Sequence, residues 1–258
     1  MNSSSIFSIS YQTIRSIIRD RLVNATLVLS LIFVGFSNYL STLTIIEERK
    51  ILLDFGFSAI SICSIAIAIF LGVTVVGKEI EKRTIYTVLS KPVSRTGYLV
   101  GKFLGGTLVN AGIVLMNSLL LVGILFYQGL EMPAGFWATI YLIILESIIV
   151  FALGMCLSLF TSSLILASSL TLAGFLLGRS NPSLRKMGES SHTSVWTKLF
   201  RVLSDLFPNL DRYNIREVVA YGKPYPEVML STSTIYFGCY VLLLLSLSVY
   251  LFYRKDLT

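Results

Sequence analysis

Few residues of this chain are of the types that carry out catalysis. There is one histidine, His192, and no cysteine or carboxylate cluster surrounds it in the sequence, so a metal site is not expected there. The three cysteines, Cys63, Cys156 and Cys239, all lie in apolar stretches, where cysteine behaves as a small hydrophobic residue. An enzyme acting on lipid would need a histidine and carboxylates that converge at one interface, so a single histidine argues against one.

The nearest approach to a nucleotide-binding motif is the run 97–103, which reads GYLVGKF. A phosphate-binding loop needs G-x-x-x-x-G-K-[ST]. This run is one residue short, and Phe103 stands where a hydroxyl should bind magnesium. This run is therefore not a nucleotide-binding site. Glycines four residues apart, at Gly97, Gly101 and Gly105, favour close helix packing instead, although such spacing also arises by chance.

Three polar side chains stand out within apolar stretches. Glu146 is the one acidic residue deep inside such a stretch, and a charge within a membrane usually faces a bundle interior or a cavity. It is a candidate for a translocation path or a dimer interface, and equally for a protonated or hydrogen-bonded packing residue. Asn38 and Asn117 are further candidates for the path or the interface, although such residues more often hold helices together.

The elements that must position these residues follow from composition. Hydrophobic residues make up 54% of the 258 residues and charged residues 14%, against about 45–50% and about 25% in soluble domains. The apolar residues form blocks long enough to span a bilayer as helices. The sequence predicts an all-α polytopic membrane bundle, one transmembrane domain over 1–258, with six transmembrane helices at 22–46, 55–77, 103–127, 136–160, 163–178 and 231–253.

The stretch 136–178 is too long for one crossing, since a helix of that length would measure about 64 Å against a hydrocarbon core of about 30 Å. We therefore expect a helical hairpin that turns at Ser158 and Thr161–Ser163. Its second arm, about 22 Å long, is short for a full crossing.

Lysine and arginine in the short loops set the orientation. They gather before residue 22, in the 78–102 loop and after residue 253, so both termini and that loop are expected in the cytoplasm. The segment 179–230 is then extracytoplasmic, although it carries eight basic residues; long segments follow the rule weakly.

Residues 6–21 place apolar side chains on one face and Arg15 and Arg19 on another, which indicates an interfacial amphipathic helix; a disordered basic tail is the alternative.

The 78–102 loop contains apolar, charged and helix-ending residues that a simple connection between two crossings would not need. Apolar residues can share one face of a short helix whose first turn holds Glu79 and Glu81, and Pro92 stops it. Ser94 can then cap the helix that enters the third crossing. The loop is expected to form a charged, partly apolar knob on the cytoplasmic face.

The pattern from Glu79 to Lys102, with Arg83-Thr84, Leu89-Ser90-Lys91-Pro92 and Gly101-Lys102, resembles the membrane subunits of type-2 ABC (ATP-binding cassette) transporters. The segment 206–214 is similar to that family too. The resemblance implies a six-helix permease that pairs with itself and docks a separate ATPase through a coupling helix in this loop. The implied ATPase-coupling residues are Glu79, Glu81, Arg83, Thr84, Val88, Leu89 and Pro92.

The same resemblance implies a multi-pass permease of a bacterial plasma (inner) membrane that exports an unidentified substrate. The chain itself would hold no cofactor and no catalytic site, because ATP and magnesium bind to the partner. The expected partners are an ABC ATP-binding subunit, a second copy, the lipid bilayer and an extracytoplasmic accessory protein, with no nucleic acid. A non-transporting scaffold or sensor of an ATPase-driven complex is the alternative, since it would need the same coupling helix.

Segment 179–230 should hold two helices. The first, over 195–207, is amphipathic and ends at Pro208; the second is capped by Asp211 and runs to Ala220, with Gly222 beyond it. In the resembling family helices here close the outer mouth; packing on the bundle is the other interpretation.

Overall fold

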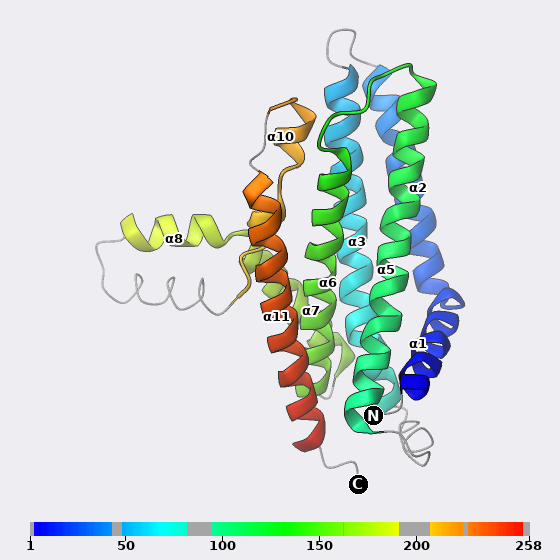
Figure 1. Cartoon of the computed structure of the whole chain (residues 1–258), viewed down its shortest axis with the longest axis vertical. Coiled ribbons are helices and arrows are strands. Elements are labelled where there is room, and N and C mark those ends of the chain that lie inside the picture. The colour runs from blue at the N-terminus through cyan, green and yellow to red at the C-terminus, as the bar shows by residue number, and fades with distance from the viewer. Residues whose placement is uncertain are drawn as a thin grey trace.

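The computed structural model describes residues 3–42, 48–81, 94–161, 163–190, 207–223 and 227–254. Every regular element within these ranges is a helix (Figure 1), which confirms the predicted all-α class. The helices are α1 Ser3–Ile18, α2 Arg21–Thr42, α3 Glu48–Glu81, α5 Arg95–Tyr127, α6 Phe136–Phe160, α7 Leu164–Arg179, α8 Asn181–Ser190, the 3₁₀ turn η1 Asp211–Tyr213, α10 Arg216–Ala220 and α11 Glu227–Arg254.

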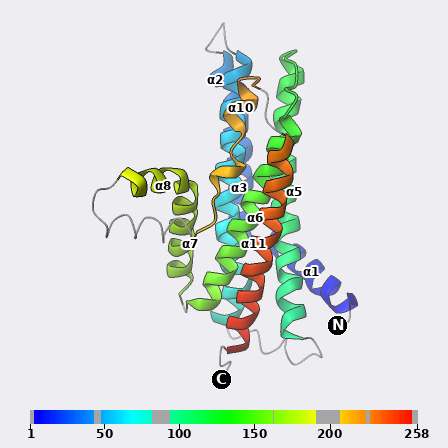
Figure 2. The ribbon, with the colours of Figure 1, turned by 60° about the vertical axis from the view of Figure 1, so that its left-hand side comes forward.

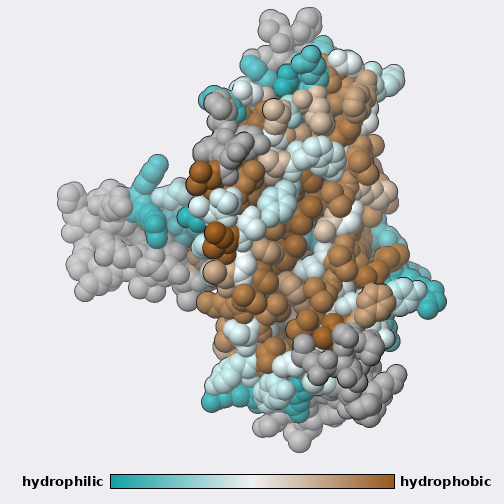
Figure 3. Space-filling view, viewed as in Figure 1, coloured by the Kyte–Doolittle hydropathy of each residue, from teal (hydrophilic) through white to brown (hydrophobic). Residues whose placement is uncertain are grey.

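Five of the described helices are long and apolar enough to cross a membrane: α2, α3, α5, α6 and α11. Figure 3 shows the matching surface, a broad hydrophobic belt with hydrophilic residues toward the two ends of the bundle. The chain is therefore a polytopic membrane protein. The helix α7 has 16 residues and falls short of that length, so the predicted count of six crossings stays a prediction.

The centre of the bundle is formed by α3 and α6. Their apolar stretches are 67% and 78% buried, against 22% for α2 and for α11, which lie outside them. Gly72 allows the two central helices to touch, because a Cβ there would lie 2.5 Å from the carbonyl oxygen of Phe151. At the same crossing a Cβ on Gly154 would lie 3.4 Å from the backbone of Gly72, so the two glycines let the helix backbones approach closely.

A helix packs closely against the glycines of α5, as predicted. The amphipathic α1 packs along the first half of α5. A Cβ on Gly101 would lie 2.8 Å from Cγ2 of Ile9, and one on Gly105 would lie 2.7 Å from Cβ of Thr13. Ser10 adds a hydrogen bond from its hydroxyl to the carbonyl oxygen of Gly101 at 3.0 Å. The N-terminal helix is therefore fixed to the bundle, and its interfacial position in the membrane remains a prediction.

The helix α3 continues four residues past the predicted end of its crossing. The expectation of a separate short helix with Glu79 and Glu81 in its first turn is wrong for these two residues, which lie on the last turn of α3. Nothing between Gly77 and Glu81 breaks a helix, and Lys, Glu and Ile all extend one at little cost. The cap predicted at Ser94 is confirmed, since its hydroxyl accepts a hydrogen bond from the amide of Gly97 at 3.1 Å.

The predicted hairpin is present. The helix α6 ends at Phe160, α7 begins at Leu164, and Ser163 caps α7. Figures 1 and 2 agree that α7 lies beside the half of α6 nearest the chain termini and that α8 points sideways from about mid-height. The second arm of the hairpin therefore stops partway along the bundle.

The chain returns to the bundle at the point where α7 left it. The amide of Leu210 donates a hydrogen bond to the carbonyl oxygen of Gly178 at 3.1 Å, and Pro208 packs on the same glycine. From there η1 and α10 continue along α6 and α3, and their apolar side chains join the buried core. The helix predicted from Asp211 to Ala220 is wrong as one element: Asp211 lies inside η1, and α10 starts at Arg216 without a side-chain cap.

The two chain termini lie at the same end of the bundle (Figure 1). This is the end at which α3 finishes and α5 starts, on either side of residues 82–93, which lie outside the described residues. Gly222, with φ of 65°, closes α10 at the opposite end in the left-handed conformation that suits glycine at a helix C-terminus. The helix predicted over 195–207 falls almost entirely on residues that the structure does not describe.

Candidate functional site: a buried ion cluster and the two helix ends at 81 and 94

The carboxylate of Glu146 is fully buried and lies between two arginines. Nη1 of Arg179, at the end of α7, donates to Oε1 at 2.9 Å, and Nη2 of Arg216, on α10, donates to Oε2 at 3.1 Å. The side chain of Arg216 is 8% exposed and that of Arg179 is 27% exposed. One carboxylate thus joins the hairpin arm α7 to the returning segment α10 on the surface of α6.

Sequence reasoning named Glu146 but not its partners. A hairpin that turns near residue 162 places residues with equal separation from the turn side by side. Thr171 lies against Gly154, and by the same register Glu146 lies opposite Arg179. This hairpin register is the sequence signal that could have identified Arg179 as a partner of Glu146. No local signal points to Arg216, because its approach depends on the return of the chain at Leu210.

The two asparagines predicted to line a translocation path or a dimer interface lie apart from each other and from the cluster of Glu146. Asn38 on α2 accepts a hydrogen bond from Nε2 of Gln128 at 2.6 Å, and so it joins α2 to the end of α5. Asn117 is buried, and its Nδ2 donates to the carbonyl oxygen of Ile113 in its own helix at 2.9 Å. Its Oδ1 has no hydrogen-bond partner among the described residues, nor has either polar atom of buried Asn110. None of these residues is in hydrogen-bond contact with Glu146 within the described chain.

The helix ends that flank residues 82–93 are tied together by side chains. Glu79, on the last turn of α3, accepts hydrogen bonds from the hydroxyl of Tyr98 and from Nζ of Lys102, both on the first turns of α5. The ring of Tyr98 is fully buried and stacks on Phe252 of α11 with centroids 5.9 Å apart. Glu81 is exposed. The helices α3, α5 and α11 therefore meet at this end of the bundle.

The remaining predicted coupling residues, Arg83, Thr84, Val88, Leu89 and Pro92, lie outside the described residues. The carboxylate of Glu79 is engaged by α5, and the predicted role of Glu79 in ATPase coupling stays a prediction. Within the described ranges, no three histidine, cysteine, aspartate or glutamate side chains come together in a way that could hold a metal ion.

Comparison with known families supplies the decisive observation. The family model described as ABC-2 family transporter protein matches residues 7–257. The chain belongs to the ABC-2 transporter family. A search of curated proteins finds no match. The ABC-2 match begins within α1 and extends beyond the end of α11, so the bundle, the hairpin and the helix ends at 81 and 94 are all parts of the family domain.

Membership in the ABC-2 family makes this chain a membrane permease subunit of an ABC transporter, and it implies a partner ABC ATP-binding subunit. Family membership also relates the two sites described above to the parts of a permease. The ends of α3 and α5 flank the loop that resembles a coupling element, and the ion cluster of Glu146 lies in the interior of the permease.

Proposed function

We propose that this permease exports its substrate as a homodimer and is driven by a separate ATPase that docks on residues 78–96 from the cytoplasm. The observation that carries the coupling role is the joint between Glu79, Tyr98 and Lys102. It lies directly beside the ends of the 82–93 segment, and it connects α3 with α5 and, through Phe252, with α11.

This joint explains how force on a short loop could reach the bundle. A connection between two independent helix ends would let each helix end move alone. Here one carboxylate holds two groups of the next helix, so a push on the loop moves the ends of α3 and α5 as one body. Packed helices respond to such a push by small rigid-body shifts, not by continuous deformation.

The docking role is tested by a pull-down of the ATPase with the permease. Glu81→Lys combined with Arg83→Glu reverses the charge at each of the two positions, keeps the net charge unchanged and leaves the joint at Glu79 as it is. Truncation of Val88 and Leu89 to alanine removes the apolar part of the same surface. Both variants should lose the ATPase while the thermal unfolding of the permease stays unchanged. Lys223→Glu, exposed at the opposite end of the bundle, is the matched control and should retain it.

Transport is a separate question from docking. The complex of permease and ATPase in liposomes should move a substrate in an ATP-dependent manner. ATPase retention in the Glu81/Arg83 and Val88/Leu89 variants would disprove the docking surface. Intact ATPase activity with no movement of any substrate would instead support the alternative of a scaffold or sensor.

A further inference from the structure

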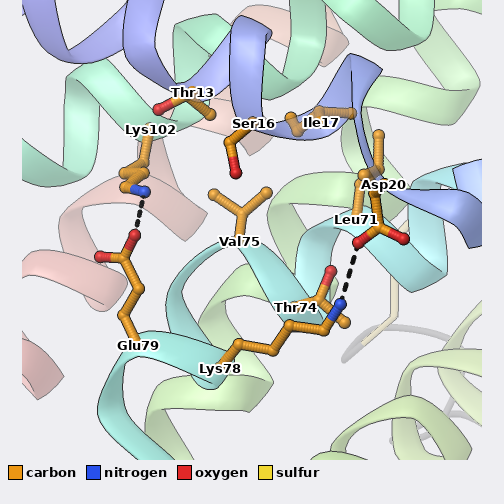
Figure 4. Close-up of a pocket in the computed structure, with 10 residues that line it drawn as sticks. All are labelled: Thr13, Ser16, Ile17, Asp20, Leu71, Thr74, Val75, Lys78, Glu79 and Lys102. Atoms are coloured by element: carbon orange, nitrogen blue, oxygen red, sulfur yellow. Dashed lines mark hydrogen bonds and ion pairs between the residues drawn. The ribbon is translucent and has the colours of Figure 1, made fainter. Parts of the chain in front are cut away.

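A polar cavity of about 110 Å³ lies where α1 meets the ends of α3 and α5 (Figure 4). Such a space holds several water molecules, since one needs about 10–15 Å³ measured in this way. The lining combines charged groups, hydroxyls and aliphatic side chains: Thr13, Ser16, Ile17, Asp20, Leu71, Thr74, Val75, Lys78, Glu79 and Lys102.

Two ammonium groups stand on opposite walls of the cavity. Nζ of Lys78 lies 3.0 Å from Oδ2 of Asp20, and Nζ of Lys102 lies 2.5 Å from Oε1 of Glu79 (Figure 4). An ammonium has three N–H donors, and within the described chain each of these makes one hydrogen bond to a carboxylate. Donors therefore remain on both walls, and Figure 4 shows the hydroxyl of Ser16 pointing into the space between them.

The surroundings of the cavity add positive charge. The two lysines and two carboxylates of the lining cancel, but Arg15 and Arg19 are exposed on α1 on the flank of the face that carries Ser16 and Asp20. The lining residues together with these two arginines carry a formal charge of +2. A ligand with a negative charge is favoured over a neutral or a cationic one.

The opposite flank of α1 is apolar and exposed. Phe7 is 75% exposed, Tyr11 62% and Ile18 57%. A helix with one such face and a basic flank lies at the boundary between headgroups and acyl chains. The cavity beneath it is thus at headgroup depth, and Ile17, Leu71 and Val75 give it an apolar wall next to its charged ones.

We propose that this cavity binds the phosphate-bearing headgroup of an anionic glycerophospholipid. The phosphate lies between Lys78, Lys102 and the hydroxyl of Ser16, and the glycerol and first acyl carbons lie along the aliphatic wall. Basic pockets between membrane helices at the bilayer surface bind anionic headgroups in this manner. The cavity shares Glu79 and Lys102 with the proposed coupling joint, but its test is separate because binding of a lipid requires neither an ATPase nor transport.

The test is thermal unfolding of the full-length permease in neutral detergent. Saturating short-chain phosphatidylglycerol should raise Tm by about 3–5 °C. Short-chain phosphatidylcholine and inorganic phosphate at the same concentration should each give less than half of that rise. Ser16→Phe fills the cavity mouth and should abolish the rise. Gln12→Phe, on an exposed position of the same helix outside the lining, should keep it.

A second variant covers the case in which Ser16→Phe does not fold. The pair Asp20→Asn with Lys78→Gln removes one ammonium without changing net charge, and the lipid-dependent rise should fall by at least half. A full rise in either variant would overturn the proposal. So would an equal rise with inorganic phosphate, which would assign the site to free anion, or an equal loss in Gln12→Phe, which would assign the effect to nonspecific adsorption on α1.

Discussion

Glu146 on α6 accepts a hydrogen bond from Arg216 on α10 at 3.1 Å, and both side chains are buried. The pair spans 70 residues of sequence and fixes the segment that returns to the bundle after α7. Removing one partner of an isolated buried pair costs about 3–5 kcal/mol, and since Arg179 still bonds to Glu146 at 2.9 Å, the loss of Arg216 alone should cost part of that amount.

Arg216→Leu should therefore lower the thermal stability of the permease. Arg212→Leu is the matched control, because Arg212 is exposed and lies over the ring of Tyr236 at 5.1 Å, a contact worth at most about 1 kcal/mol. Unfolding of both variants in detergent compares the two. Equal losses would show that the contact with Glu146 contributes nothing beyond an ordinary surface arginine.

The attachment of α1 can be tested at Gly105. Gly105→Ala places a methyl group 2.7 Å from Cβ of Thr13 and 2.8 Å from the carbonyl oxygen of Ser10, so α1 must shift, at a cost of about 1–3 kcal/mol. Gly112→Ala, in the same helix with nothing within 4 Å, should stabilise by up to about 1 kcal/mol through helix propensity. Proteolysis within α1 should accelerate in the first variant alone. Similar rates in both would contradict the close packing of α1 on α5.

The two asparagines should respond in opposite ways. Asn38→Leu leaves Gln128 without one of its partners and should cost about 1 kcal/mol. Asn117→Leu keeps a side chain of similar shape and removes a buried oxygen that has no partner in the described structure, so it should be neutral or stabilising. Thermal unfolding measures both. A stable Asn117→Leu permease that no longer transports would support the predicted role of Asn117 in the path.

The ion pair of Asp20 with Lys78 should make the stability of the fold depend on pH. Burial acts to raise the pKa of Asp20, but the hydrogen bonds from Lys78 and from the amide of Leu22, together with the charge of Lys78, lower it below its ordinary value of 3.8. The pair therefore stabilises the fold above that value and loses its effect as pH falls through the pKa of the folded state. The pair is partly exposed, so its contribution at neutral pH is at most about 1 kcal/mol.

Asp20→Asn should accordingly be slightly less stable than the wild type at neutral pH, and the difference should shrink as pH falls below the ordinary pKa of 3.8 and through the lower pKa of the folded state. Unfolding curves of both proteins across this range measure the difference. A gap of constant size at all pH values would mean that the asparagine perturbs packing and that the charge of Asp20 is not involved.

The features that depend on local sequence could be predicted. The cap at Ser94 needs only a hydroxyl three residues before an amide, and the hairpin follows from the length of the apolar stretch ending at Gly178. The spacing of Gly97, Gly101 and Gly105 indicated a close helix neighbour. It did not identify α1, because a stripe of glycines gives the distance of approach and not the identity of the partner.

The features that depend on where distant segments meet could not be predicted. Arg216 looks like an ordinary basic residue of a loop until the bond between Leu210 and Gly178 brings α10 onto α6. The extension of α3 to Glu81 was missed for a related reason. Acidic residues at a helix C-terminus interact unfavourably with the helix dipole, and here Tyr98 and Lys102 from the next helix offset this by bonding to Glu79.

The hydrogen bond between Leu210 and Gly178 makes the bundle tolerant of insertion between them. Since the two ends of the intervening segment are held in contact, a longer or shorter segment costs only a slowly growing closure entropy, about 0.6 kcal/mol for each doubling of length. A reporter or affinity domain inserted between these two residues is therefore expected to leave the described helices of the bundle in place, so this position is the natural place to give the permease a new appendage.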